Sequence, residues 1–166
     1  QLLAGCHSST RGVFSGGLSA NVMDYITIVT TGNATDFGDM TVSRWNLTGL
    51  NSSTRGVFAG GFDGSGKSNV MDYITIASTG NASDFGDLTA NKQQLAGCHS
   101  TTRGCFGGGT TGSNTNVIEY ITIASTGNAS DFGDLTTSRV CRGAVNSSAG
   151  RGCFGSLGTI DYITIS

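Results

Sequence analysis

The chain has 166 residues, of which 27 are glycine, none is proline and only 12 % are charged. A net charge of −2 with nine basic residues argues against a nucleic-acid partner. No apolar run approaches the roughly 18 residues of a membrane-spanning helix, so we expect no membrane insertion. The first residues, QLLAGCHSST, resemble no leader, and we expect a segment of a longer chain or a processed product.

Each repeat of this sequence contains four short segments that predict β-strands. In the first repeat these segments are 3–9, 11–17, 21–29 and 34–41. Apolar and polar residues alternate with a period of two, which is typical of strands, and no segment has a sustained helical period. We therefore expect an all-β protein with four antiparallel strands in each repeat.

The repeats follow one another with a nearly constant spacing. DYITI at 24–28 returns at 72–76, as EYITI at 119–123, and again at 161–165. An arginine before the second strand recurs at intervals of 44, 48 and 48 residues: Arg11, Arg55, Arg103 and Arg151. We expect a single repeat domain, 1–166, with repeats at 1–44, 45–92 and 93–139 and a partial repeat at 140–166.

A repeat of about 40–50 residues with four strands is typical of a β-propeller blade. One blade cannot bury both of its faces, whereas neighbouring blades cover each other. The structural alternative is a β-solenoid, although its coils are usually much shorter. Because the fourth repeat lacks the TGN-x-x-DFGD segment, we expect that the chain continues, that copies associate, or that four blades close into a monomer.

The order of residues within each repeat resembles the kelch repeat. A double glycine follows the second strand at Gly16–Gly17, Gly60–Gly61 and Gly107–Gly108, whereas the fourth repeat has Gly155–Ser156. The matching aromatic positions, in which phenylalanine replaces the usual tryptophan of kelch repeats, are Tyr25, Tyr73, Tyr120, Tyr162, Phe37, Phe85 and Phe132. This resemblance covers the whole chain and implies a kelch-like β-propeller.

A second resemblance concerns the nearly identical repeats around DYITIASTGNASDFGDLT at 72–89. This sequence is similar to repeat proteins encoded by marine and cyanobacterial phages, which implies a virion or tail-associated protein. Copper radical oxidases are also built on kelch blades, but all four tyrosines here share one repeated structural position. We therefore expect a protein without enzymatic activity and without a cofactor.

Several motifs favour a structural role over chemistry. Residues 61–68, GFDGSGKS, match the phosphate-binding loop pattern, but the segment that follows predicts a strand instead of the helix that such a loop requires. The thrice-repeated DFGD predicts a packed phenylalanine with aspartates that bind turn amides, and calcium coordination is the alternative. The recurring arginine is expected to bind neighbouring carbonyl or carboxylate groups.

Histidine and cysteine positions are also explained by the repeats. His7 and His99 share a position that Asn51 fills in repeat 2, which favours hydrogen bonding over a metal site. The five cysteines show no C-x-x-C spacing. Cys6, Cys98, Cys105 and Cys153 take positions that hold valine or leucine in other repeats, so we expect them to be small buried hydrophobic residues.

Two connections vary between repeats while the other two barely change. The second connection varies at 18–21, 62–69 and 110–116, and the crossover to the next repeat varies at 42–47, 90–95 and 137–142. In a four-stranded blade these connections lie at one end of the propeller, where a rigid scaffold presents variable loops for binding. Relaxed surface drift is the alternative explanation. Trp45 is expected either to anchor an interface or a glycan or to pack at the edge of a blade. The candidate binding residues are Trp45, Phe62, Asp63, Lys67, Asn69, Asn91, Lys92, Asn114, Asn116 and Arg142.

The sequence therefore predicts a structural or binding propeller of a phage particle. Its partners would be a cell-surface polysaccharide, a neighbouring virion protein or a second copy of the chain. The alternatives are a glycan- or protein-binding propeller of cellular origin, secreted or cytoplasmic, and an oxidase-like enzyme on the same scaffold.

Overall fold

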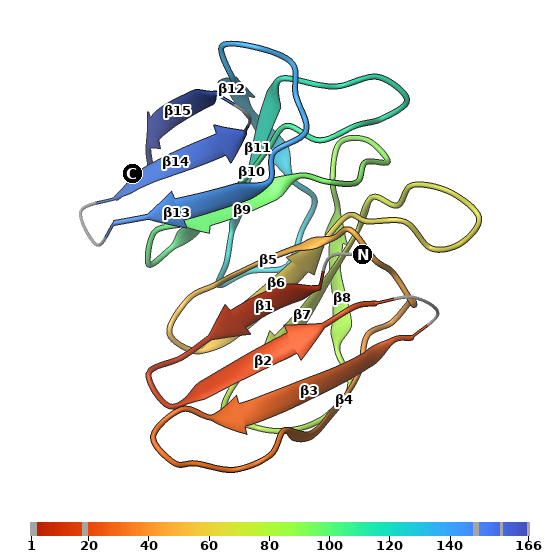
Figure 1. Ribbon diagram of the computed structural model, residues 1–166, viewed down its shortest axis with the longest axis vertical. Coiled ribbons are helices and arrows are strands. Elements are labelled where there is room, and N and C mark those ends of the chain that lie inside the picture. Colours follow the sequence, from red (N-terminus) through yellow and green to blue (C-terminus); the bar gives the residue numbers. More distant parts are fainter. Residues whose placement is uncertain (1–2, 18–19, 148–149, 157, 166) are drawn as a thin grey trace.

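The structure is a computed structural model that describes residues 3–17, 20–147, 150–156 and 158–165. In these residues every regular element is a β-strand, and none is a helix that could cross a membrane. Fifteen strands form four separate antiparallel sheets, which are arranged as the four blades of a β-propeller (Figure 1). The predicted all-β propeller of antiparallel blades is therefore confirmed.

The blades follow the chain order, and each one is a simple meander. Blade 1 contains β1 (Ala4–His7), β2 (Arg11–Ser15), β3 (Val22–Thr27) and β4 (Thr35–Asp39). Blade 2 contains β5 (Thr48–Asn51), β6 (Arg55–Ala59), β7 (Val70–Thr75) and β8 (Ser83–Asp87). Blade 3 contains β9 (Ala96–His99), β10 (Arg103–Gly107), β11 (Val117–Thr122) and β12 (Ser130–Asp134). Blade 4 contains β13 (Gly143–Asn146), β14 (Arg151–Ser156) and β15 (Thr159–Thr164).

The first strand of each blade lies at the centre of the molecule, where successive blades approach most closely (Figure 1). A glycine makes this approach possible, because a Cβ atom on Gly49 would lie 2.5 Å from the carbonyl oxygen of Gly5. The double glycine lies where β2, β6 and β10 end, and its residues have positive φ angles. Strand register places the pair of blade 3 at Gly108–Gly109, one residue later than the sequence suggested, since Gly107 still pairs within β10.

One phenylalanine of each of blades 2, 3 and 4 packs into the preceding blade. Phe58, Phe106 and Phe154 are at most 1 % exposed, and each joins the hydrophobic core of the blade before its own. The fit is close, because a Cβ atom on Gly107 would lie 2.8 Å from the ring of Phe154. The blades are therefore joined by a repeated contact in which an aromatic side chain enters a depression of the neighbouring sheet.

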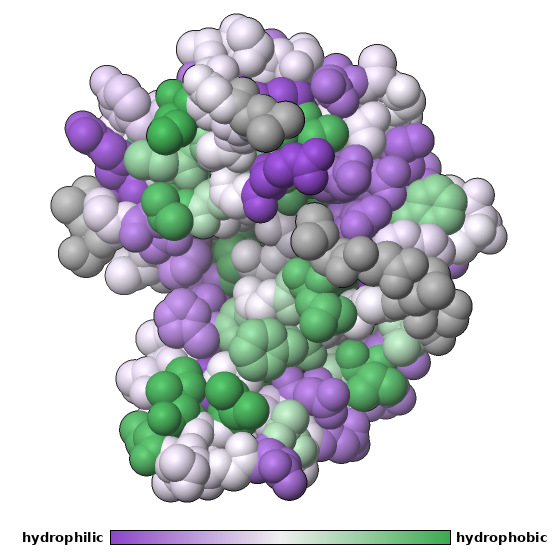
Figure 2. Space-filling model, in the orientation of Figure 1, coloured by the Kyte–Doolittle hydropathy of each residue, from purple (hydrophilic) through white to green (hydrophobic). Residues whose placement is uncertain are grey.

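Blades 1 and 4 each have a face that no other described blade covers. Phe14, the counterpart of Phe58, is 46 % exposed, and Ile160 at the other end of the array is 75 % exposed. Figure 2 shows hydrophobic side chains over both terminal blades, with an indentation of the outline between them. The arrangement of four blades thus leaves two apolar faces at its ends.

All five cysteines have free thiols. Cys6, Cys98, Cys105 and Cys141 are buried, the first three as the sequence predicts, and burial raises the pKa of Cys6 to about 12 and that of Cys105 to about 11. Cys153 differs, because it lies on the uncovered face of blade 4 and is only partly buried. Cys153 is therefore more exposed than its counterpart Cys105, because no described blade covers it.

We expect the same substitution to have opposite consequences in blades 1 and 2. Phe58→Ala should lower the free energy of unfolding by about 3–5 kcal/mol, because it empties a packed depression. Phe14→Ala should change it by less than about 1 kcal/mol, because the ring is already half exposed. Urea unfolding of both variants measures the difference, and equal losses would contradict the open face of blade 1.

Candidate functional site

The variable connections meet at one end of the propeller, as the sequence predicts. We call this the variable-loop end: the crossovers 40–47, 88–95 and 135–142 and the loops 16–21, 60–69 and 108–116, of which Leu18 and Ser19 lie outside the described residues. Backbone hydrogen bonds join the two kinds of connection, for example from the Gly61 amide to the Lys92 carbonyl at 2.9 Å. At the opposite end the first and third connections meet, and the Ile28 amide donates to the Thr10 carbonyl.

An aromatic pair stands on the variable-loop end of blade 2. Trp45 of the crossover and Phe62 of the following loop exchange both backbone hydrogen bonds, with N···O distances of 3.0 and 2.8 Å. Their ring centroids lie 5.0 Å apart with an angle of 44° between the planes. Both side chains are half-buried, so each ring keeps part of its surface accessible. An aromatic surface with polar neighbours is the arrangement that proteins use to stack on sugar rings.

Blade 3 has the same backbone bridge between its crossover and its loop, but different side chains at the two bridged positions. Gln93 and Thr110 form the equivalent bridge, with N···O distances of 3.2 and 2.9 Å. In blade 4 the crossover position is Val140, and its loop includes residue 157, which lies outside the described residues. The scaffold therefore holds the loop bases in one geometry, while the side chains that they present change from blade to blade.

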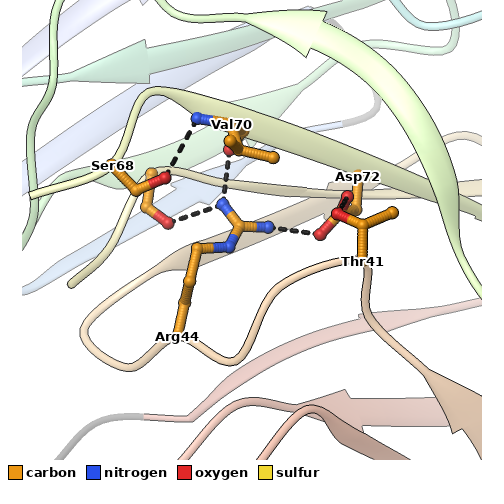
Figure 3. A network of polar contacts seen from close by, with 6 residues as sticks. Thr41, Arg44, Ser68, Val70 and Asp72 are labelled. Atoms are coloured by element: carbon orange, nitrogen blue, oxygen red, sulfur yellow. Dashed lines mark hydrogen bonds and ion pairs between the residues drawn. The ribbon is translucent and has the colours of Figure 1, made fainter. Parts of the chain in front are cut away.

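A buried arginine fixes the base of the Trp45 crossover. Arg44 is 0 % exposed, and its guanidinium donates to the carbonyl oxygens of Gly60 at 2.8 Å and Val70 at 2.5 Å (Figure 3). The same guanidinium pairs with the carboxylate of Asp72, which also accepts a hydrogen bond from Thr41. Burial lowers the pKa of Arg44, and the nearby Asp72 carboxylate opposes that shift. Arg44 thus connects the crossover, the loop after β6 and strand β7.

The same ion pair recurs in the later blades. Lys92 pairs with Glu119 in blade 3, and Arg139 pairs with Asp161 in blade 4 at 2.5 Å. Burial would raise the pKa of Asp161, but hydrogen bonds from Thr136 and Arg139 hold it below its ordinary value. Lys92, which the sequence suggested as a binding residue, is therefore 2 % exposed and belongs to the scaffold. The basic residue recurs in each crossover and its acidic partner recurs in the third strand of the following blade. This recurrence is the sequence signal that identifies the ion pairs.

The remaining candidate binding residues are accessible to different degrees. Asp63, Asn91, Asn114 and Arg142 are exposed, whereas Lys67, Asn69 and Asn116 are partly buried. The structure brings Trp45, Phe62 and Asp63 together at one loop, while Asn114 belongs to the loop of blade 3. Arg142 lies beside the open face of blade 4.

Residues 61–68 do not adopt a phosphate-binding loop. Phe62 and Lys67 pair as a short antiparallel bridge, and strand β7 follows, as the sequence predicts. The Asp63 carboxylate accepts hydrogen bonds from the amides of Ser65 and Gly66, both at 2.8 Å, and these bonds lower its pKa. The Asp63 carboxylate therefore accepts the hydrogen bonds of backbone amides that would bind the anion in a phosphate-binding loop.

The recurring arginine and tyrosine stack in all four blades, and a phenylalanine contacts the tyrosine in blades 1–3. Arg11 and Arg55 donate to carbonyl oxygens of the following blade, those of Ile76 at 2.9 Å and Ile123 at 3.0 Å. Arginine–tyrosine stacking, with 4.3–4.7 Å from Cζ to the ring centroid, recurs in Arg11–Tyr25, Arg55–Tyr73, Arg103–Tyr120 and Arg151–Tyr162. Edge-to-face contacts join Tyr25–Phe37, Tyr73–Phe85 and Tyr120–Phe132.

Backbone amides of the DFGD segments are bound by asparagine side chains, whereas the sequence suggested aspartate side chains. The amides of Asp39 and Asp87 are bound by the side-chain oxygens of Asn81 and Asn128 from the next blade, each at 3.0 Å. Phe37 and Phe85 are buried as predicted, whereas Phe132 is only partly covered. The TGN segment therefore has a packing function, because its asparagine connects one blade to the last strand of the blade before it.

A depression of about 210 Å³ opens at the opposite end, between blades 2, 3 and 4, and its lining residues include Asn51, His99 and Asn146. The amides of His7 and His99 donate to the side chains of Asn51 and Asn146 at 3.2 and 3.4 Å. These bonds connect neighbouring inner strands. In the part of the chain that the structure describes, no group of three or more histidine, cysteine or acidic side chains could hold a metal.

Comparison of the sequence with protein-family models found no match, and neither did comparison with curated proteins.

We expect the buried carboxylate of blade 2 to matter far more than its exposed counterpart in blade 1. Asp72→Asn should lower the free energy of unfolding by about 3 kcal/mol, because it leaves the Arg44 guanidinium buried without its counter-charge. Asp24→Asn, at the equivalent exposed position, should leave stability almost unchanged. Thermal unfolding of both variants provides the comparison, and similar stabilities would contradict this role for the ion pair.

Mild acid should destabilise the fold partly through His99. Burial lowers the pKa of His99 below its ordinary value of 6.5, so the unfolded chain binds this proton more readily than the folded chain. Stability from this residue is therefore present above about pH 6.5 and is lost as the pH falls. The variant His99→Asn should show a smaller decrease in urea midpoint between pH 7.5 and pH 5.5, and an unchanged decrease would contradict this assignment.

Proposed function

We propose that this chain is a kelch-like, non-enzymatic binding propeller of a phage particle, and that its variable-loop end contacts a glycan of the host surface. The observation that carries the proposal is the half-buried Trp45–Phe62 pair, which stands on a base fixed by Arg44. The assignment to a virion rests on the sequence resemblance noted for residues 72–89.

The chemistry of the surface supports a carbohydrate as the ligand. Aromatic rings bind the apolar faces of sugars, and neighbouring polar groups such as the exposed Asp63 carboxylate accept hydrogen bonds from hydroxyl groups. The charges at this loop, Asp63 and Lys67, are of opposite sign, and a chain with a net charge of −2 provides little electrostatic attraction for a strongly charged partner. A neutral or weakly charged polysaccharide therefore fits this surface best.

The arrangement of side chains supports a binding role without catalysis. The acidic residues Asp72, Glu119 and Asp161 are committed to ion pairs. The tyrosines face stacked arginines and occupy one structural position in each blade. The loops at the variable-loop end differ between the blades in length and in side chains, which is the pattern expected of loops that bind on a rigid scaffold.

Trp45 is the single tryptophan of the chain, so its fluorescence reports directly on this site. We expect bacterial surface polysaccharides that are positive on a glycan array to shift its emission in a saturable titration. Phe62→Ala should weaken the binding about tenfold or more, because it removes half of the stacking surface. Trp45→Ala should do the same when binding is measured by calorimetry.

Gln93→Ala is the matched control, because Gln93 occupies the equivalent bridge in blade 3 without an aromatic ring. This variant should bind the polysaccharide as the parent chain does. Binding that is lost equally in Gln93→Ala and Phe62→Ala, or an array without any positive glycan, would argue against a glycan site at this aromatic pair.

A further inference from the structure

The two terminal faces of the molecule are complementary halves of the contact that joins its blades. On blade 1, Phe14, Ile26 and Ile28 occupy the positions that pack into the preceding blade elsewhere in the chain. The counterparts of Ile28 are Ile76 and Ile123, both 0 % exposed, whereas Ile28 itself is 50 % exposed. We call this surface the Phe14 face.

The uncovered side of blade 4 has the features of the corresponding depression. Val145 and Ile160 are 69 % and 75 % exposed, whereas their counterparts Cys98 and Ile118 in blade 3 are 0 % and 1 % exposed. A largely apolar depression of about 550 Å³, lined by these residues with Cys153 and Gly155, lies between them. A Cβ atom on Gly155 would meet only the Gly143 oxygen at 3.8 Å, so this position has room for a ring. We call this depression the blade 4 socket.

The internal contacts show how such a socket is filled. In blade 3 the equivalent surface holds Phe154 and Ile165 of the next blade, which pack against Cys98, Cys105 and Ile118. Phe106 and Phe58 occupy the corresponding sites in blades 2 and 1. Within the described residues this interface therefore forms three times, and one socket and the half-exposed Phe14 ring are left without a partner blade.

We propose that the blade 4 socket binds the Phe14 face of a second copy of this chain. The first three strands of blade 4 present the same positions as those of blades 1–3, so the new contact continues the same blade-to-blade packing without the fourth strand that takes part in the internal interfaces. A polar contact also fits this arrangement. Arg11 and Arg55 donate to the Ile76 and Ile123 carbonyls of the following blade, and Arg151 of blade 4 would reach the Ile28 carbonyl of the second copy.

The contact joins two different faces, so it is heterologous and proceeds from head to tail. Every molecule carries both the Phe14 face and the blade 4 socket. At concentrations above the dissociation constant, each copy can therefore bind one copy through its face and another through its socket. Exposed apolar faces of this kind are characteristic of protein–protein interfaces. The proposal does not depend on glycan binding, because Trp45 and Phe62 belong to neither face.

Sedimentation velocity of the 166-residue chain tests this interface directly. Association should increase with concentration over a hundredfold range up to about 1 mM. Phe14→Asp and Ile160→Asp should each raise the dissociation constant by about 30-fold or more, since each removes a central residue of the interface. Both side chains are exposed in the single molecule, so the variants should keep the thermal midpoint of the parent chain.

Mixing the two variants distinguishes a head-to-tail contact from a symmetric one. Phe14→Asp retains the socket and Ile160→Asp retains the ring, so a one-to-one mixture should form a heterodimer that grows no further. Val29→Asp is the matched control, because Val29 is 70 % exposed and its counterparts Ala77 and Ala124 remain exposed in covered blades. This variant should associate like the parent chain.

Cys153 provides an independent chemical measurement of socket occupancy. Its counterpart Cys105 is 0 % exposed beneath the next blade, so association should slow the alkylation of Cys153 as concentration rises. Phe14→Asp should abolish this protection. The proposal is overturned by a chain that stays monomeric over the whole range, by variants that associate normally, by a mixture without heterodimer, or by alkylation that is independent of concentration.

Discussion

The insertion of one phenylalanine into the sheet before it is the contact on which the rest of this structure depends. Each blade is a short meander that cannot bury both faces, and Phe58, Phe106 and Phe154 close the gap to the neighbouring sheet. Glycine on the inner strand, as at Gly49, lets the backbones approach closely enough for this packing. The spacing of the blades then determines where the crossovers and loops meet, and therefore where Trp45 and Phe62 lie.

Much of this arrangement could be predicted from residue order, because local patterns encode it. The period-two alternation in DYITI, the repeated glycine pairs and the regular spacing of arginine identify the strands, the blades and the end at which the variable loops gather. These features depend on neighbours within a few residues. The same reasoning correctly placed a strand after GFDGSGKS and thereby excluded a phosphate-binding loop.

Other features could not be predicted, because they depend on what lies across an interface. Phe14 and Phe58 stand in the identical segment STRGVF, yet one is 46 % exposed and the other is buried, since only the second has a preceding blade. Lys92 looked like a loop residue available to a ligand, but it pairs with Glu119, which is 27 positions away in the sequence. Comparing the three basic residues with the three acidic residues across repeats would have revealed that partnership.

A chain in which each sheet touches only its neighbours behaves as a one-dimensional array. Blades 2 and 3 have neighbours on both sides, whereas blade 1 has one, and blade 4 has one neighbour and three strands. Cooperativity in such arrays falls off toward the ends, so local opening begins at the termini and proceeds inward. The loop pair of Trp45 and Phe62 is tied through Arg44 to blade 2, which has neighbours on both sides, so fraying of blade 4 leaves this pair intact.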